Sequence, residues 1–131
     1  MLGMITSRKI HAAAAAATFL LLSACGSSSS SPAATLPAGV GLEVGAGPGI
    51  RFDKTRYTAT AGTVKVAYVS HDSIRHTLVI KDADQVQLPG ELEVAADGAI
   101  DVKDYDLKPG TYTLFCDVPG HGAMKAELVV K

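Results

Sequence analysis

The residues with the most distinctive chemistry lie near the C-terminus of the chain. Cys116, His121 and Met124 fall within a stretch of nine residues, and His76 lies forty positions before the cysteine, just ahead of the apolar residues 78–80. One thiolate, two imidazoles and a weak thioether form the ligand set of a mononuclear blue-copper electron-transfer site. The sequence therefore predicts that His76, Cys116, His121 and Met124 bind one copper ion.

A second upstream histidine, His71, is the alternative to His76. His71 lies in the polar run of residues 70–75, whereas His76 precedes apolar residues typical of a strand, whose ladder would fix its backbone. We therefore favour His76 and expect His71 at the surface. For Met124, the alternative is an apolar side chain that covers the metal without bonding to it.

The first 24 residues have the layout of a secretory signal peptide. Arg8 and Lys9 precede an apolar stretch that is too short for a stop-transfer helix, and small residues close it. Residues 22–25, Leu-Ser-Ala-Cys, resemble a bacterial lipobox. The resemblance implies cleavage before Cys25 and lipidation of that cysteine. The alternatives are an ordinary secretory signal, with Cys25 incidental, or an uncleaved anchor.

Residues 25–38 read as the lipidated cysteine followed by a flexible tether. Residues 26–37 are rich in Ser, Ala and Pro, and such a segment cannot bury enough apolar surface to order itself. The tether would hold residues 39–131, a single domain, on the periplasmic or extracellular side of the cell membrane.

From about Gly39, short apolar runs alternate with turn residues, which is typical of strands. A short helix is considered only at residues 91–96. Seven or eight short strands in about 90 residues indicate an all-β, antiparallel sandwich. We expect strands at residues 40–44, 50–52, 57–59, 64–69, 78–80, 100–102, 112–116 and 126–130.

Residues 75–80 and 110–124 resemble the cupredoxin family, the plastocyanin- and azurin-like blue-copper proteins. The resemblance implies a Greek-key β-sandwich or barrel of seven or eight mostly antiparallel strands. It also implies a type 1 copper held by the four predicted ligands, and one-electron transfer. One departure is Thr77, because the family often places Asn directly after the upstream histidine to brace the ligand loops. A hydroxyl cannot duplicate all the hydrogen bonds of a carboxamide.

Charge and motifs exclude other classes of function. The net charge is −1 and would become about −3 on loss of Arg8 and Lys9, and no basic stripe supports nucleic-acid binding. No catalytic triad is evident, and a metal with a full ligand set has no open position for hydrolysis. We therefore expect neither enzyme activity nor a small-molecule substrate.

The sequence predicts a monomeric, membrane-anchored carrier of single electrons between transient redox partners outside the cytoplasm. The edge of His121, with apolar residues around it, is the expected path for electrons. The alternative is a copper-binding protein for extracytoplasmic scavenging or delivery, although the expected mature chain has no Met- or His-rich tract. Zinc is the alternative metal, but a thioether is an unusual fourth ligand for structural zinc.

Overall fold

The computed structural model describes residues 35–131, which contain eight strands and no helix. In this part of the chain there is accordingly no helix that could cross a membrane. The predicted signal peptide, Cys25 and most of the predicted tether lie outside the described residues. The strands are β1 (Leu42–Ala46), β2 (Arg56–Ala59), β3 (Gly62–Ser70), β4 (His76–Lys81), β5 (Leu92–Val94), β6 (Ile100–Leu107), β7 (Gly110–Phe115) and β8 (Lys125–Val130).

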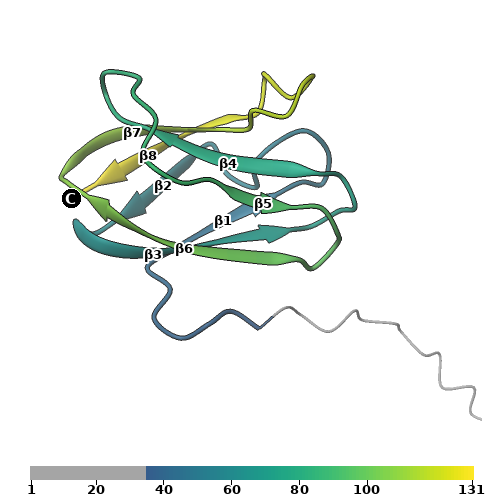
Figure 1. Ribbon diagram of the computed structural model, residues 1–131, viewed down its shortest axis with the longest axis horizontal. Helices are drawn as coiled ribbons and strands as arrows, with labels where there is room; N and C mark the ends of the chain where they lie inside the picture. Colours follow the sequence, from purple (N-terminus) through teal and green to yellow (C-terminus); the bar gives the residue numbers. More distant parts are fainter. Residues whose placement is uncertain (1–34) are drawn as a thin grey trace, which may run out of the picture.

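The strands form two sheets that pack face to face (Figure 1). The smaller sheet has the order β1-β3-β6, and the larger has the order β2-β8-β7-β4-β5. Two pairs, β1–β3 and β2–β8, are parallel, and the other four are antiparallel. The predicted all-β sandwich with mostly antiparallel strands is therefore confirmed, with each sheet mixed rather than purely antiparallel.

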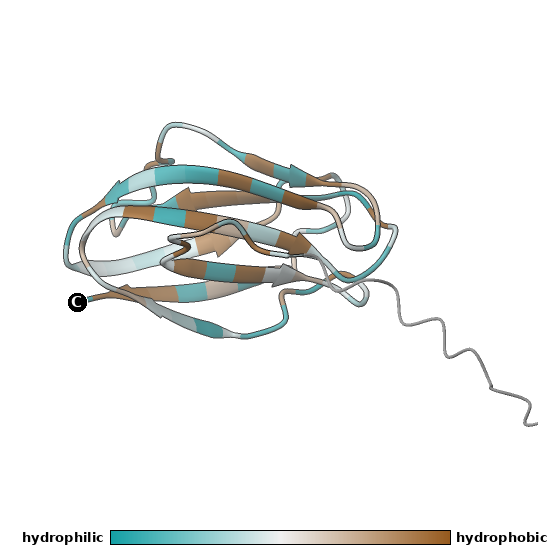
Figure 2. Cartoon of the chain, turned by 90° about the horizontal axis from the view of Figure 1, so that it is seen from below, coloured by the Kyte–Doolittle hydropathy of each residue, from teal (hydrophilic) through white to brown (hydrophobic). Residues whose placement is uncertain are grey.

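The core lies between the sheets and follows from the two-residue alternation of the strands. Along β7, Tyr112 and Leu114 are buried while Thr113 and Phe115 are partly exposed. Hydrophobic and hydrophilic residues alternate in the same way along much of the cartoon in Figure 2. Successive side chains of a strand point to opposite faces, so one face of each sheet supplies the core.

Two details of the predicted strand pattern were wrong. Residues 91–96 contain strand β5 rather than a short helix, because Leu92 and Val94 are buried on one face and Glu93 is exposed on the other. Residues 50–52 form no strand: the backbone amide of Gly47 donates to the carbonyl of Arg51 in a turn. Only an isolated bridge at position 52 remains of the predicted pairing.

Candidate metal centre

Two neighbouring strands bring the predicted nitrogen and sulfur donors together. His76 is the first residue of β4, and Cys116 directly follows the last residue of β7. These strands are antiparallel, with Val79 opposite Phe115, so the start of β4 and the end of β7 meet at one edge of the sandwich. His121 follows in the loop between β7 and β8.

The three donors converge in a buried cluster. The donor atoms of His76, Cys116 and His121 all lie within 4.8 Å of one another. Sγ of Cys116 lies 3.5 Å from Nδ1 of His121, and the centroids of the two imidazole rings are 5.2 Å apart. The exposed fractions of the three residues are 0%, 2% and 8% in chain order. Donors at this separation could all contact a single metal ion.

The loop from Cys116 to Met124 is closed by its own backbone. The amide of His121 donates to the carbonyl of Val118 over 2.9 Å, and the amide of Met124 donates to the carbonyl of His121 over 2.8 Å. The amide of Cys116 donates to the carbonyl of Met124 over 3.2 Å. Met124 is only 1% exposed. The loop therefore holds a buried thioether beside the cysteine and the histidine.

Asp72 orients the ring of His76. Its Oδ1 lies 3.2 Å from Nε2 of the histidine, and its two oxygens also accept the backbone amides of Ile74 and Gly49, over 2.9 and 2.8 Å. Burial opposes the ionised form, but these amides and the imidazole outweigh it and lower the pKa of Asp72 below its ordinary value. An ionised carboxylate only accepts hydrogen bonds, so in the neutral imidazole Nε2 carries the proton and Nδ1 keeps a free lone pair.

Thr77 connects the upstream strand to the cysteine. Its backbone amide donates to Sγ of Cys116 over 3.4 Å. Its hydroxyl donates to Oδ1 of Asp117 over 2.6 Å and accepts the backbone amide of Asp117 over 2.9 Å. The hydroxyl also lies 3.5 Å from Sγ, but it has one proton, and the shorter contact with a carboxylate is the stronger. Thr77 and Asp117 thus form the brace between the ligand segments.

The buried environment of Thr77 is completed from the facing sheet. The hydroxyl of Tyr68, on β3, donates to the carbonyl of Thr77 over 3.1 Å. Burial, and then the charge of Cys116, raise the pKa of Tyr68, so its phenol stays protonated as a donor. Both sheets therefore fix the backbone that follows His76.

The donor set fits copper better than structural zinc. A thiolate, two imidazoles and a weak thioether are typical of type 1 copper, whereas structural zinc normally has four strong donors. Within residues 35–131 the donor cluster contains no carboxylate. Nδ1 of His76 is buried and has no hydrogen-bond partner. Buried polar atoms are rarely left unpaired, so this nitrogen is itself a sign of a missing bond to a metal.

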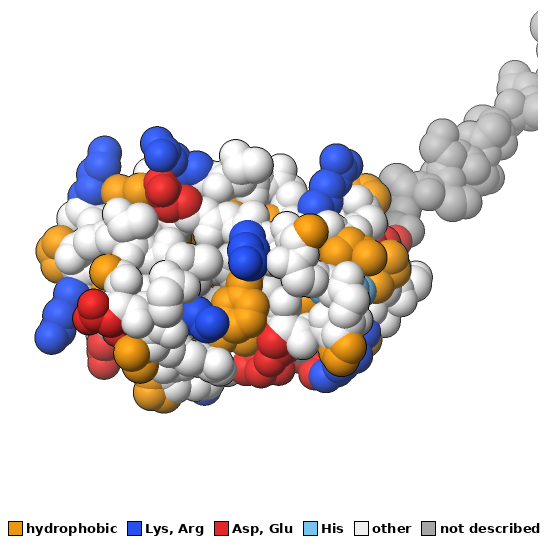
Figure 3. Space-filling view, turned by 90° about the horizontal axis from the view of Figure 1, so that it is seen from above, with side chains coloured by type: hydrophobic (Ala, Val, Ile, Leu, Met, Phe, Trp, Pro, Cys, Tyr) orange, Lys and Arg blue, Asp and Glu red, His pale blue; other side chains and the backbone are white. Residues whose placement is uncertain are grey.

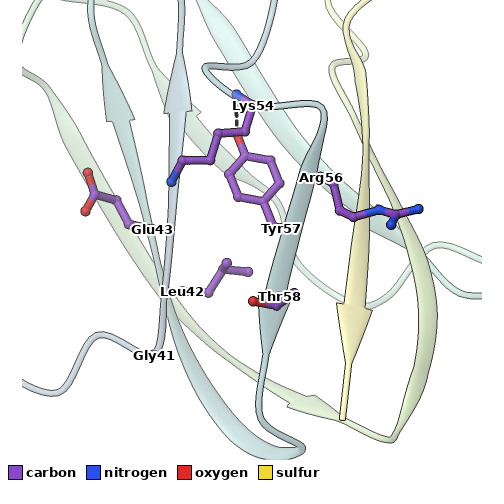
Figure 4. A pocket seen from close by; sticks show the side chains of 7 residues that line it. All are labelled: Gly41, Leu42, Glu43, Lys54, Arg56, Tyr57 and Thr58. Carbon is purple, nitrogen blue, oxygen red and sulfur yellow. Dashed lines mark hydrogen bonds between the residues drawn. The ribbon is translucent and has the colours of Figure 1, made fainter.

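A separate hollow lies between the edge strands β1 and β2 (Figure 4). Leu42 and Glu43 line one side of it, and Arg56 and Tyr57 line the other. The backbone amide of Lys54 donates to the Tyr57 hydroxyl over 3.3 Å. No histidine, cysteine or methionine lines this hollow, so it offers no comparable metal ligands.

Solved structures resemble this chain, whereas no protein-family model and no curated protein sequence matches it. Auracyanin A, a "blue" copper protein from the green thermophilic photosynthetic bacterium Chloroflexus aurantiacus, superposes with a TM-score of 0.57 at 23% identity, covering 68% of this chain and 96% of that one. The chain therefore has the cupredoxin fold, as the sequence resemblance predicted.

Two further solved structures resemble the chain. Amicyanin from Paracoccus versutus superposes with a TM-score of 0.54 at 22% identity, covering 76% of this chain and 88% of that one. An azurin from the obligate methylotroph Methylomonas sp. strain J superposes with a TM-score of 0.55 at 16% identity, covering 72% and 99%. Identities this low show a shared fold and nothing more, so the site must be argued from this chain's own residues.

The structure brings together the four side chains that the sequence singled out. His71 is exposed and lies outside the cluster of donors. Sequence reasoning missed Asp72, which it placed in a polar turn, and Asp117. The available signals were a carboxylate four residues before the histidine and another directly after the cysteine.

Proposed function

We propose that this chain is a type 1 copper protein that carries single electrons between redox partners. The observation that carries the proposal is the buried cluster of three donors, one of which, Nδ1 of His76, lacks any partner in the protein. When bound there, copper would supply a one-electron couple between Cu(II) and Cu(I). The thiolate of Cys116, the imidazoles of His76 and His121 and the thioether of Met124 would hold it.

The chain's own residues would do three things for such a couple. Asp72 keeps the proton of His76 on Nε2, so that Nδ1 stays free for the metal. The amide of Thr77 hydrogen-bonds the cysteine sulfur and stabilises its thiolate. The closed loop excludes water, since His121 is only 8% exposed. Four donors leave no open position for a substrate, which suits a carrier rather than an enzyme.

A visible spectrum tests the copper site directly. We expect the full chain loaded with copper(II) to show an intense thiolate-to-copper absorption band that ascorbate bleaches and an oxidant restores. The variant Cys116→Ser, which changes one atom of the side chain, should lack the band. A colourless protein that still binds copper would instead favour scavenging or delivery of the metal.

We further propose that the mature protein begins at a lipidated Cys25 and works as a monomer on the outer side of the cell membrane. The support is the lipobox-like sequence of residues 22–25. Cys25→Ala should abolish labelling with a fatty acid and leave the first 24 residues uncleaved, which a mass measurement of the purified protein would show. A protein that stays membrane-bound and unlabelled in both forms would be anchored by other means.

A further inference from the structure

A groove runs beside the loop from Cys116 to Met124, the ligand loop, on the outer face of the larger sheet. It has a volume of about 490 Å³, and Cys116 itself is among its lining residues. Phe115 and Val118 supply apolar wall, and Lys81 and Lys125 supply cationic side chains. In the space-filling view of this face, basic side chains flank an apolar patch close to the ligand loop (Figure 3).

The strand register explains why the two lysines flank the aromatic ring. Lys125 on β8 lies directly opposite Phe115 on β7. Lys81 on β4 lies opposite Thr113, which is two residues before Phe115 on β7. Residues so placed share one face of the sheet. Nζ of Lys81 lies 4.3 Å from the centroid of the Phe115 ring, a cation–π contact.

Neither ammonium group is neutralised within the part of the chain that the structure describes. Every ion pair found between residues 35 and 131 involves other side chains, so neither Lys81 nor Lys125 has a carboxylate within 4.0 Å. The only acidic residue lining the groove is Asp117, and its Oδ1 already accepts the hydroxyl of Thr77.

The groove also differs from the rest of the domain in charge. Residues 39–131 carry three more acidic than basic side chains, whereas the groove lining carries one more basic than acidic. Outside the groove lining, Asp117 interacts with the carboxyl of Glu91, whose pKa is raised by burial and then by the charge of Asp117, and with the guanidinium of Arg75. The groove lining therefore has the charge that acidic side chains of a partner would complement.

We propose that this groove is the docking site for the carboxylate side chains of an acidic redox partner. The proposal rests on the proposed electron-carrier function and specifies its partner. Carboxylates of the partner would pair with Lys81 and Lys125, and its apolar edge would cover Phe115. Charged rims of this kind steer encounter and fix orientation more than they add affinity. Docking there would bring the partner next to Phe115, which is bonded through the backbone to Cys116.

The test maps anion binding without requiring copper. Hexacyanochromate(III), a paramagnetic and redox-inert trianion, is added to the isotope-labelled, metal-free full chain, and line broadening is followed by nuclear magnetic resonance. We expect broadening to concentrate around Lys81, Phe115 and Lys125, and to be reversed by a hexaglutamate peptide. In Lys81→Gln/Lys125→Gln the apparent dissociation constant should rise on the order of tenfold at low salt.

Two matched variants complete the test. Lys108→Gln/Lys131→Gln removes the same charge at the opposite end of β7 and β8, and it should bind the trianion like the parent. Lys81→Arg/Lys125→Arg keeps the charge and should bind the trianion as the parent does. Broadening elsewhere, or broadening that the Gln pair leaves unchanged, would overturn the proposal.

A membrane surface is the competing source of negative charge. Vesicles containing phosphatidylglycerol that bind through the same lysines, while hexaglutamate neither binds nor displaces the trianion, would also overturn the proposal. Because no step uses copper, a failure here is distinct from a missing absorption band. The band tests the proposed function, and the broadening tests the groove.

Discussion

The carboxylate of Asp72 lies 3.2 Å from Nε2 of His76, and the other ring nitrogen of that histidine has no partner in the protein. The same carboxylate accepts the amides of Gly49 and Ile74. One acidic side chain therefore fixes the ring of a predicted ligand and ties it to the loop that follows β1. Partners of this kind commonly orient and tune metal-bound histidines.

Removing this carboxylate should weaken the metal site without removing a ligand. We expect Asp72→Ala to lower zinc affinity by about 10- to 100-fold and to raise the reduction potential of the copper form. The potential should rise because a negative charge near the oxidised metal is lost. Competition titration and redox titration measure the two effects. Asp104→Ala, which removes an exposed carboxylate from β6, should change neither, and an unchanged Asp72→Ala would refute the role.

Gly47 offers an independent way to disturb the same carboxylate. Its φ is +82°, and a methyl group on it would overlap the carboxylate of Asp72. Gly39 has a similar φ of +78°, and a methyl group there would meet only Nζ of Lys65, at 4.0 Å. Both alanine variants should lose about 1–2 kcal/mol through left-handed strain. Only Gly47→Ala should also weaken metal binding. Equal metal affinities in the two variants would contradict this account.

The hydroxyl of Thr77 should be essential to the brace between the ligand segments. Thr77→Val keeps the shape but leaves the amide and carboxylate of Asp117 without their partner, at a cost of about 1–3 kcal/mol. Denaturant unfolding of the metal-free protein measures the loss. Thr77→Ser, which keeps the hydroxyl, should recover most of it. The thiolate absorption band should shift in the valine variant, since the position of the sulfur depends on this brace.

Metal binding should stabilise the folded protein. The buried Nδ1 of His76 gains a partner when a metal binds, and a ligand that binds only the folded state adds about 2.7 kcal/mol at a hundred times its dissociation constant. Thermal unfolding with and without zinc should show the gain as a rise in midpoint. Cys116→Ser should lose most of that rise while keeping its metal-free midpoint within a few degrees.

The ion pair of Arg75 and Glu93 predicts a pH effect outside the cluster of donors. The hydrogen bond from Arg75, 2.6 Å between Nη2 and Oε2, lowers the pKa of Glu93 below its ordinary value. The stabilisation is therefore present above the ordinary pKa of a glutamate and is lost as the pH falls through the lower, folded-state pKa. In Arg75→Gln, a pH titration followed by nuclear magnetic resonance should find that the Glu93 pKa has returned towards its ordinary value. An unmoved pKa would show that the pair is not formed in solution.

The fold was largely predictable because apolar and polar residues alternate along the strands. Runs such as residues 64–69 and 126–130 place apolar side chains on one face, and β3 and β8 cover both. The edge segments were harder. The loop at residues 50–52 has the composition of a strand, but a turn closed between Gly47 and Arg51 prevents its pairing. At β5 only Leu92 and Val94 carry the signal, which is too short to distinguish a strand from a helix.

The donor residues of the candidate site could be predicted from the sequence, but the residues that hold those donors in place could not. Soft and imidazole donors are rare in this chain, so Cys116, His121 and Met124 stood out by type and spacing. Asp72 and Asp117 are common residue types in polar loops, and nothing in the sequence says which carboxylate faces which ring. The role of Asp117 depends on its contact with Thr77, forty residues away in the sequence, which the pairing of β4 with β7 establishes. The role of Asp72 depends on the turn that brings its carboxylate onto His76, four residues later.

The closed backbone of the ligand loop has a consequence for the speed of the proposed electron exchange. The hydrogen bonds among Cys116, His121 and Met124, and the bond from the Thr77 amide to the sulfur, involve no metal. They hold the donors in place whichever charge the metal carries, and close-packed surroundings resist displacement. Little atomic movement would then accompany each change of oxidation state. The reorganisation energy should be small, and with it the activation barrier of every exchange.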